Sequence, residues 1–251
     1  MKNSKVFIKV ITCALCAVIL SCGSTQKDEE EVTIQKLISE GKYEEAKALF
    51  KTKTDINAQD ADGNTALHIA AAVNEADLIT FLVVKGADPS ITNNAGDTPL
   101  HVAVKADNID ATTALIDSKA DIFARDADNN SALQLALSKD DLWYDVMINE
   151  SSANLRDSNG DTLVHYFARM ADERAINYCL SKGLPLSEKN NEDKTPCAIC
   201  FENAADQVSI RIAAKLLQAG ATPVRGDFAY FEDAVRTHNV MLRFADGQTP
   251  L

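Results

Sequence analysis

The sequence predicts an all-α solenoid of helix-turn-helix units joined by short, turn-rich fingers. A nine-residue phrase carries the prediction: it reads GNTALHIAA at 63–71 and GDTPLHVAV at 96–104, and weaker copies follow. Counted from its Ser/Thr position, the phrase recurs at residues 65, 98, 131, 162 and 195, in steps of 33, 33, 31 and 33 residues. A fixed period in this range is typical of solenoids built from stacked supersecondary units.

Each unit is predicted to contain two helices. The Ser/Thr side chain caps the first helix, and Pro99 or Pro196 then takes the first helical position, where its missing N–H costs nothing. A second apolar helix ends at a glycine such as Gly86 or Gly220, as expected for a C-cap with positive φ. Polar stretches rich in Asp, Asn and Gly join the units, at 59–64, 92–97 and 125–130, and predict tight turns. One unit cannot bury its apolar face alone, so the units must stack.

The phrase resembles the opening of an ankyrin repeat, Thr-Pro-Leu-His-x-Ala with a period of 33. The resemblance covers roughly residues 33 to 245 and indicates about seven units, with 33–61 as a degenerate first unit and 225–251 as a divergent cap. It implies a histidine that ties its own turn to the Thr and to the next unit. It also implies a partner bound on the concave face, which finger tips and the exposed ends of the first helices form. The step of 31 reflects two residues missing between 153 and 157.

The segment before the repeats predicts export and lipidation. A short basic start precedes an apolar run of eleven residues at 10–20, which fits a signal peptide and is too short for a comfortable membrane span. The run ends in ILSCG at 19–23, which resembles a bacterial lipobox; Leu20 departs from the usual small residue, as in the looser boxes of spirochaetes. We expect a signal peptide at 1–21, acyl chains such as palmitate on Cys22, an acidic linker at 22–32 and the repeat domain at 33–251. Plain secretion and an uncleaved anchor are the alternatives.

Charge argues against two classes of partner. Removing residues 1–21 takes away three lysines and no acid, so the formal net charge changes from −12 to −15. Such an acidic chain is poorly suited to nucleic acid or to an anionic lipid surface.

Histidine and cysteine offer little to an enzyme. Three of the four histidines occupy the His position of the phrase: His68, His101 and His165. His238 lies outside it. Cys197 and Cys200 form a Cys-x-x-Cys but occupy inward-facing positions of the phrase, and no second pair completes a zinc site. Buried small hydrophobes are therefore favoured over a redox pair or a disulfide across one helical turn. With no catalytic or phosphate-binding motif present, we predict no catalysis, no cofactor and no metal.

The predicted concave face becomes basic from unit three onward. The residues predicted to bind a partner are Lys105, Arg125, Lys139, Arg156, Arg169, Met170, Lys189 and Lys194. We expect an acidic segment or domain of another protein there, with Arg156 and Arg169 as anchors, because arginine pairs bidentately with carboxylates. The alternative is that these bases only neutralise finger aspartates such as Asp126 and Asp157.

A second surface is conceivable at Trp143 and Tyr144. An exposed Trp143 would be an interface anchor, and the alternative is that it packs inward.

The function expected from all these features is a membrane-tethered adaptor of the bacterial envelope. The alternatives are a periplasmic stabiliser or inhibitor of one enzyme, and a surface lipoprotein that binds host molecules.

Overall fold

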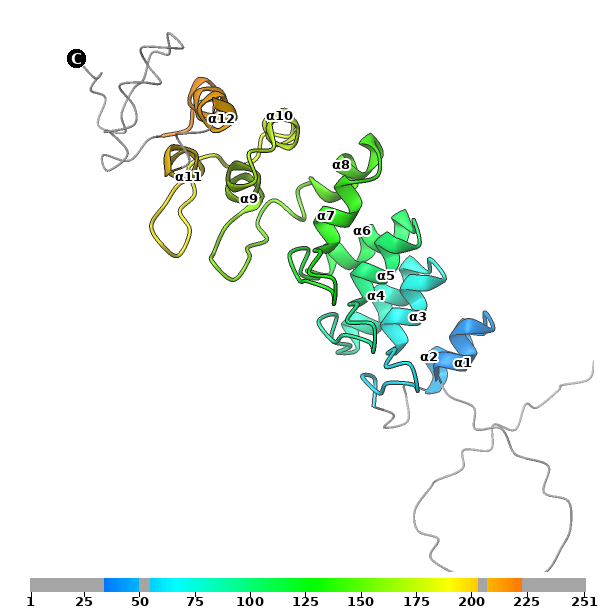
Figure 1. The fold of residues 1–251 in the computed structure, drawn as a ribbon. Coiled ribbons are helices and arrows are strands. Elements are labelled where there is room, and N and C mark those ends of the chain that lie inside the picture. The colour runs from blue at the N-terminus through cyan, green and yellow to red at the C-terminus, as the bar shows by residue number, and fades with distance from the viewer. Residues whose placement is uncertain (1–33, 50–54, 203–206, 223–251) are drawn as a thin grey trace, which may run out of the picture. The chain divides into compact units, whose positions relative to one another are not determined.

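The computed structural model describes residues 34–49, 55–202 and 207–222. All regular elements in these ranges are helices, and one isolated β-bridge pairs Arg125 with Ser131. The helices form six consecutive pairs (Figure 1): α1 (Ile34–Ser39) and α2 (Tyr43–Leu49), α3 (Ala66–Ala72) and α4 (Ala76–Val84), α5 (Pro99–Lys105) and α6 (Ile109–Asp117), α7 (Ala132–Leu137) and α8 (Asp141–Met147), α9 (Leu163–Arg169) and α10 (Glu173–Ser181), α11 (Pro196–Glu202) and α12 (Gln207–Gln218). We number these pairs units one to six, and each finger takes the number of the unit whose first helix it precedes. The predicted all-α solenoid is confirmed, whereas Cys22, His238 and the predicted cap at 225–251 lie outside the described residues.

Stacking of the units buries the apolar positions of the phrase. Helix α3 packs on α5, α5 on α7 and α9 on α11, while the second helices α4, α6 and α8 pack in succession. The phrase leucines Leu67, Leu100 and Leu133 are each no more than 1% exposed. They belong to one core that runs from Ile34 to Ala221. Because each unit shares its apolar face with its neighbours, the core is continuous along the stack.

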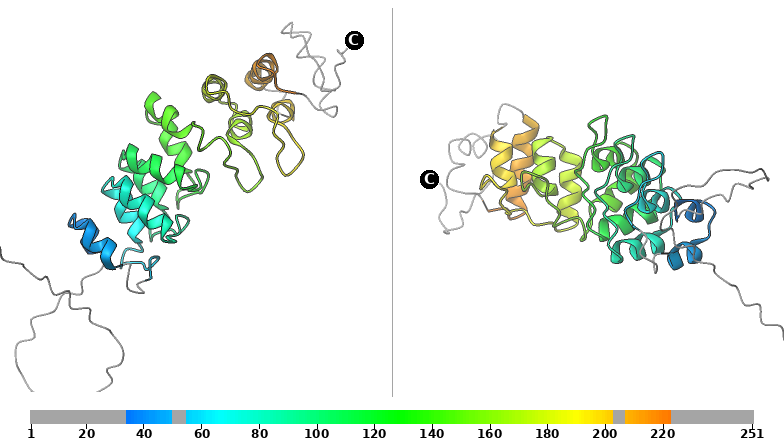
Figure 2. Two further views of the ribbon diagram at one scale, coloured as in Figure 1. Left: turned by 180° about the vertical axis from the view of Figure 1, so that it is seen from behind. Right: turned by 90° about the horizontal axis from the view of Figure 1, so that it is seen from below.

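Each finger contains a turn, and the side chain of one polar residue closes that turn by hydrogen bonds to the backbone. Asp60 Oδ1 accepts the backbone N–H groups of Asp62 and Asn64 at 2.9 and 2.8 Å. The equivalent residues of the later fingers accept the same two N–H groups: Asn93, Asp126, Asp157 and Asn190. Short Asp and Asn side chains suit this local bond, which confirms the predicted turn-rich fingers. The fingers project on the side of the first helices, as Figures 1 and 2 show.

The repeat histidines join one unit to the next. The N–H of Thr65 donates to His68 Nδ1 at 3.1 Å, so Nε2 carries the proton and donates to the carbonyl of Asp97 at 2.9 Å. His165 lies likewise between Thr162 and the carbonyl of Lys194, at 2.9 Å. Burial lowers the pKa of both His68 and His165, which keeps the rings neutral for this bond. The predicted structural role of the histidines is confirmed.

The three described cysteines are part of the core. Cys179, Cys197 and Cys200 are fully buried, and none of them forms a disulfide. Burial raises the pKa of Cys179 and of Cys200 to about 12, so both thiols stay protonated at neutral pH. The Cys-x-x-Cys spacing therefore marks small buried side chains, as the register of the phrase predicted.

Candidate protein-binding surface

Each first helix from α3 to α9 ends in a pair of exposed residues at the predicted concave face. The pairs are Ala72 and Val73, Lys105 and Ala106, Ser138 and Lys139, and Arg169 and Met170. Val73 is 36% exposed and Met170 is 54% exposed, and each directly follows its helix as the C-cap residue. The surface therefore combines apolar side chains with charged ones, which is the composition of a protein interface more than of a substrate pocket.

Lys105 and Arg169 occupy equivalent positions and pair with finger carboxylates of their own units. Lys105 Nζ lies 2.5 Å from Asp97 and 3.0 Å from Asp126, a residue of the next finger at the position that Asn93 holds in unit three. Arg169 donates from Nε and Nη2 to Asp161 Oδ2, at 3.1 and 2.8 Å. The hydrogen bond with Asp161 raises the pKa of Arg169. These two bases fix fingers against helix ends.

Arg156 joins two fingers. Its Nη1 donates to the carbonyls of Gly160 and Lys189, at 2.9 and 3.1 Å, and its Nη2 lies 2.9 Å from Glu188. Gln59 occupies the same place in finger two and also bonds its own finger and the next one. The Glu188 side chain is 49% exposed, so this ion pair is open to water.

The remaining predicted bases also have partners within the chain. Lys189 Nζ lies 3.5 Å from Asp193, whose side chain is 89% exposed. Lys194 pairs with Glu192 and Glu202, at 2.7 and 2.5 Å. Arg125 donates to the carbonyl of Asn129 and to Gln134 Oε1, at 2.7 and 3.2 Å. The structure thus places the basic residues along the fingers and helix ends, each already engaged by a neighbouring group.

Lys139 and Trp143 form one cluster in unit four. The Lys139 ammonium donates to the carbonyl of Val104 at 2.6 Å, pairs with Asp107, and lies 5.1 Å from the centroid of the Trp143 ring. Trp143 is only 3% exposed, so it packs inward and the conceivable interface anchor is not present. The indole replaces a polar residue of the usual pattern and repacks because the core can accept its apolar area.

Tyr144 is also buried, in a stack with Tyr178 whose ring centroids are 4.7 Å apart. The residue exposed at this place is Leu142, at 53%. In the sequence, Trp143 stands out by its residue type. Which of Leu142, Trp143 and Tyr144 is exposed depends on how helix α8 is rotated about its axis. Another exposed apolar residue, Val84 at 78%, lies at the end of the second helix α4.

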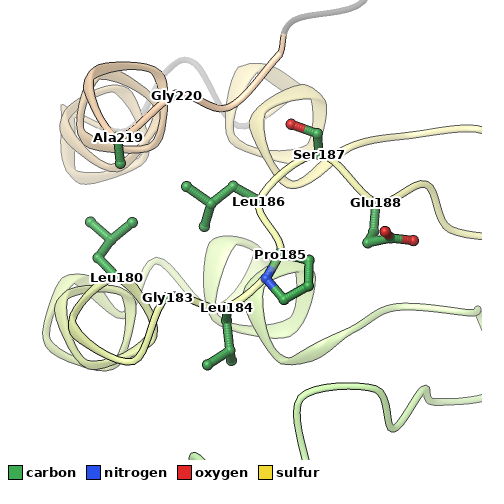
Figure 3. Close-up of a pocket in the computed structure, with 9 residues that line it drawn as sticks. All are labelled: Leu180, Gly183, Leu184, Pro185, Leu186, Ser187, Glu188, Ala219 and Gly220. Carbon is green, nitrogen blue, oxygen red and sulfur yellow. The ribbon is translucent and has the colours of Figure 1, made fainter. Parts of the chain in front are cut away.

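A surface hollow lies between units five and six, with a volume of about 460 Å³. It is lined by Leu180, Gly183, Leu184, Pro185, Leu186, Ser187, Glu188, Ala219 and Gly220 (Figure 3). In this close-up Leu180, Leu186 and Ala219 face the gap between the helix ends, whereas Glu188 points away from it. The polar lining residues have partners elsewhere, since Ser187 Oγ lies 3.2 Å from Thr222 Oγ1 and Glu188 pairs with Arg156. No group of three or more metal-ligating side chains is found in the described part of the chain.

Comparison with known proteins matches the repeat pattern. A family model described as ankyrin repeats (3 copies) matches residues 13–93, 34–126 and 69–144, which together span more than half of the 251 residues. The ankyrin repeat protein FPV219 of fowlpox virus (strain NVSL) is 48% identical over 40 residues, or 16% of this chain; the match spans only 9% of the viral protein.

One solved structure is also similar. It is the complex of the Bd0816 predatory endopeptidase of Bdellovibrio bacteriovorus with the immunity protein Bd3460. The alignment covers 72% of this chain and 96% of a chain of that complex, at 26% identity and a TM-score of 0.42.

Proposed function

Because this chain belongs to the ankyrin-repeat family, we propose that it is a protein-binding adaptor of the bacterial envelope, without catalytic activity and tethered to a membrane by acyl chains on Cys22. Ankyrin repeats mediate protein–protein interaction, and the coarse function follows from the family. The observation that carries the binding surface is the row of exposed first-helix ends, from Val73 to Met170. This row continues over units two to five, so one partner can contact several units at once.

The partner is expected to be an acidic segment or domain that also covers apolar side chains. An acidic group can replace Glu188 on Arg156 or Asp193 on Lys189, because both of these ion pairs are exposed and exposed pairs contribute only about 0–1 kcal/mol. Arg169 cannot leave Asp161 so easily, because the Asp161 side chain is 1% exposed. We therefore propose Arg156, Lys189 and Met170 as the contact centre, with Arg169 holding the finger in place.

A matched pair of double variants tests the surface. The partner is first captured by cross-linking of the envelope fraction and identified by mass spectrometry. Binding is then compared between wild type, Val73→Glu/Met170→Glu, and Val84→Glu/Leu142→Glu. The first double variant should weaken binding at least tenfold, or about 1.4 kcal/mol. The control alters two equally apolar, exposed residues on second helices and should bind like wild type. Equal loss in both variants would exclude a first-helix surface.

The tether requires its own experiment. No helix among the described residues has the length and apolarity to cross a membrane. The tether is proposed from the ILSCG sequence at 19–23 alone. Intact mass spectrometry of the native protein should show acyl chains on Cys22 and loss of residues 1–21, and Cys22→Ser should move the protein to the soluble fraction. An unmodified Cys22 in a membrane-bound protein would instead support an uncleaved anchor.

The same capture experiment distinguishes the alternatives. A single enzyme recovered in equimolar amount, and inhibited or stabilised by the purified chain, would favour the stabiliser or inhibitor. Protease digestion of intact cells would identify a surface lipoprotein, because only a surface-exposed chain is cleaved.

A further inference from the structure

Adjacent fingers are joined by backbone hydrogen bonds at two places. The N–H of Asn94 donates to the carbonyl of Asp62 at 3.0 Å, and the N–H of Asn191 donates to that of Asn159 at 2.9 Å. Between fingers four and five the equivalent groups are the N–H of Ser158 and the carbonyl of Asp128. Both fingers are described throughout, and no such bond connects these two residues. Fingers three and four also lack the bond, which would join the N–H of Ala127 to the carbonyl of Ala95, but they approach closely, because a Cβ on Gly96 would lie 2.8 Å from Ala127 N.

One substitution explains why the fingers cannot meet there. Where neighbouring fingers approach closely, the residue at the crossing is a glycine with positive φ: Gly63 at 78°, Gly96 at 78° or Gly160 at 74°. A Cβ on Gly63 would lie 2.7 Å from Asn94 N, and one on Gly160 would lie 2.9 Å from Asn191 N. Finger four has Asn129 at this position, with φ 65° and a Cβ. At Gly63, Gly96 and Gly160 a Cβ would collide with the next finger, so the Cβ of Asn129 excludes the same close approach.

The histidine tie is missing at the same boundary. His68, His101 and His165 each donate to a carbonyl of the following unit. Unit four has Gln134 instead, whose Oε1 accepts from Ser131 N and from Arg125, both within unit four. The Gln134 amide oxygen is used within its own turn, and no bond from this side chain to unit five is found among the described residues.

Tyr166 fills the space between units four and five on the finger side. Its equivalents in the earlier units are the smaller Ile69, Val102 and Leu135. The Tyr166 ring lies 5.4 Å from the Phe123 ring of unit four, and its Oη is buried without a hydrogen-bond partner. A buried hydroxyl without a partner disfavours the closed contact, because opening would let water reach it.

The opposite side of this boundary is held firmly. Tyr144 of α8 stacks on Tyr178 of α10, and the Arg174 guanidinium lies 4.6 Å from the Tyr144 ring centroid. Arg174 also pairs with Asp141, and Lys182 pairs with Asp145 at 2.8 Å. These side-chain contacts can act as a pivot while the fingers separate.

We propose that the solenoid contains a hinge between units four and five, which opens on the finger side about the contact of α8 with α10. The two blocks that it joins are 55–155 and 156–222. Three features place the hinge: Asn129 in place of glycine, Gln134 in place of histidine, and the unsatisfied hydroxyl of Tyr166. Opening changes the curvature of the first-helix surface, so a partner that contacts both blocks would select one hinge angle.

Distance distributions between spin labels test the hinge in the full-length, lipid-anchored chain. The hinge-spanning pair is Asp128→Cys/Glu192→Cys, and the matched pair within one block is Asp62→Cys/Asp128→Cys. Each pair is two units apart and replaces exposed finger residues, and the three buried thiols, of Cys179, Cys197 and Cys200, should not take up label. We expect the hinge-spanning distribution to be at least twice as wide as the matched one. Equal widths would overturn the hinge.

A repaired protein tests the cause. Asn129→Gly/Gln134→His restores both ties, and it should narrow the hinge-spanning distribution towards the matched one. Asp193→Gly makes the same change at the left-handed position of finger six and should leave the distribution unchanged. If the repaired protein stays as broad as wild type, the assignment of the hinge to these two residues is wrong.

Discussion

Arg169 binds Asp161 through two nitrogens of its guanidinium group, which lie 3.1 and 2.8 Å from Oδ2 of the carboxylate. The other oxygen of Asp161 accepts from Asn190 Nδ2 at 2.6 Å, so the carboxylate connects a helix end, its own finger and the next finger. The same two positions, eight residues apart, hold Asp97 and Lys105 in unit three, and Lys194 and Glu202 in unit six with the charges reversed. Where both positions are charged, the charges are opposite, in either order; units two and four have the uncharged pairs Asn64 and Ala72, and Asn130 and Ser138.

Loss of Arg169 should destabilise the fold. Arg169→Met leaves the Asp161 carboxylate, only 1% exposed, with Asn190 as its remaining side-chain partner. We expect the free energy of unfolding to fall by about 2 kcal/mol, the range for hydrogen bonds to charged groups. Urea denaturation followed by circular dichroism measures it. Lys189→Met is the control and should cost less than about 0.5 kcal/mol, because its ion pair is exposed. Equal costs would contradict a structural role for Arg169.

Acid should weaken the fold through the repeat histidines. Burial holds the pKa of His68 and of His165 below 6.5, so below that pH the unfolded chain binds more protons than the folded one. Stability is therefore present above pH 6.5 and is lost as the pH falls, by up to about 1.4 kcal/mol per histidine for each pH unit. Urea denaturation at pH 7.5 and 5.5 measures the loss.

His165→Gln separates this effect from general acid denaturation. Gln134 shows that glutamine can complete the turn, because it closes a capping box with Ser131. The variant should lose about 1 kcal/mol at pH 7.5 with the bond to Lys194. It should also be less sensitive to acid than wild type. An unchanged dependence on pH would rule out a contribution from His165.

Substitutions at two glycines should separate the energetic cost of a left-handed backbone from the cost of a collision between fingers. Gly183 has φ 68°, and a Cβ there would meet no atom within 4 Å, whereas a Cβ on Gly160 would lie 2.9 Å from Asn191 N. Gly183→Ala should cost about 1 kcal/mol for its left-handed backbone. Gly160→Ala should cost about 3 kcal/mol, since overpacking adds to the strain. Thermal or urea denaturation compares them, and similar values would argue against close finger contact.

The buried thiols should be unreactive in the folded protein. Because the pKa of Cys179 and Cys200 is raised to about 12, roughly one molecule in ten thousand carries the thiolate at pH 8. A protein without residues 1–22 should react slowly with a disulfide reagent, and all three remaining thiols should react after denaturation in guanidinium. Rapid labelling of Cys179 in the native protein would show that unit five opens locally, and rapid labelling of Cys197 or Cys200 would show the same for unit six.

Much of the fold could be predicted because its signals are local. The caps Thr65 and Thr98 and the phrase leucines act within one or two turns of helix, so residue type and spacing suffice to predict helix pairs and their core. The histidine role was also predictable, from the register of the phrase. The sequence left both orientations of Trp143 open, because a residue type at an unusual repeat position does not indicate which way the helix presents it.

The candidate surface was predicted only in part. The positions along the helix ends follow from the repeat, and the structure places Lys105, Arg169 and Met170 there. The alternative that these bases neutralise finger aspartates such as Asp126 holds for Lys105, which pairs with Asp126 of the next unit. Which base meets which carboxylate depends on how the units stack.

By itself, the sequence determined the repeat, its helix pairs and the burial of His and Cys, since caps and apolar periodicity are properties of neighbouring residues. Only the tertiary structure decided where consecutive units are tied and where they are not. The tie needs a finger to approach another within hydrogen-bond distance, and the Cβ of Asn129 and the ring of Tyr166 take up that space between units four and five. The effect of Asn129 and Tyr166 on the contact between units four and five therefore depends on the neighbouring unit that stacking places beside them.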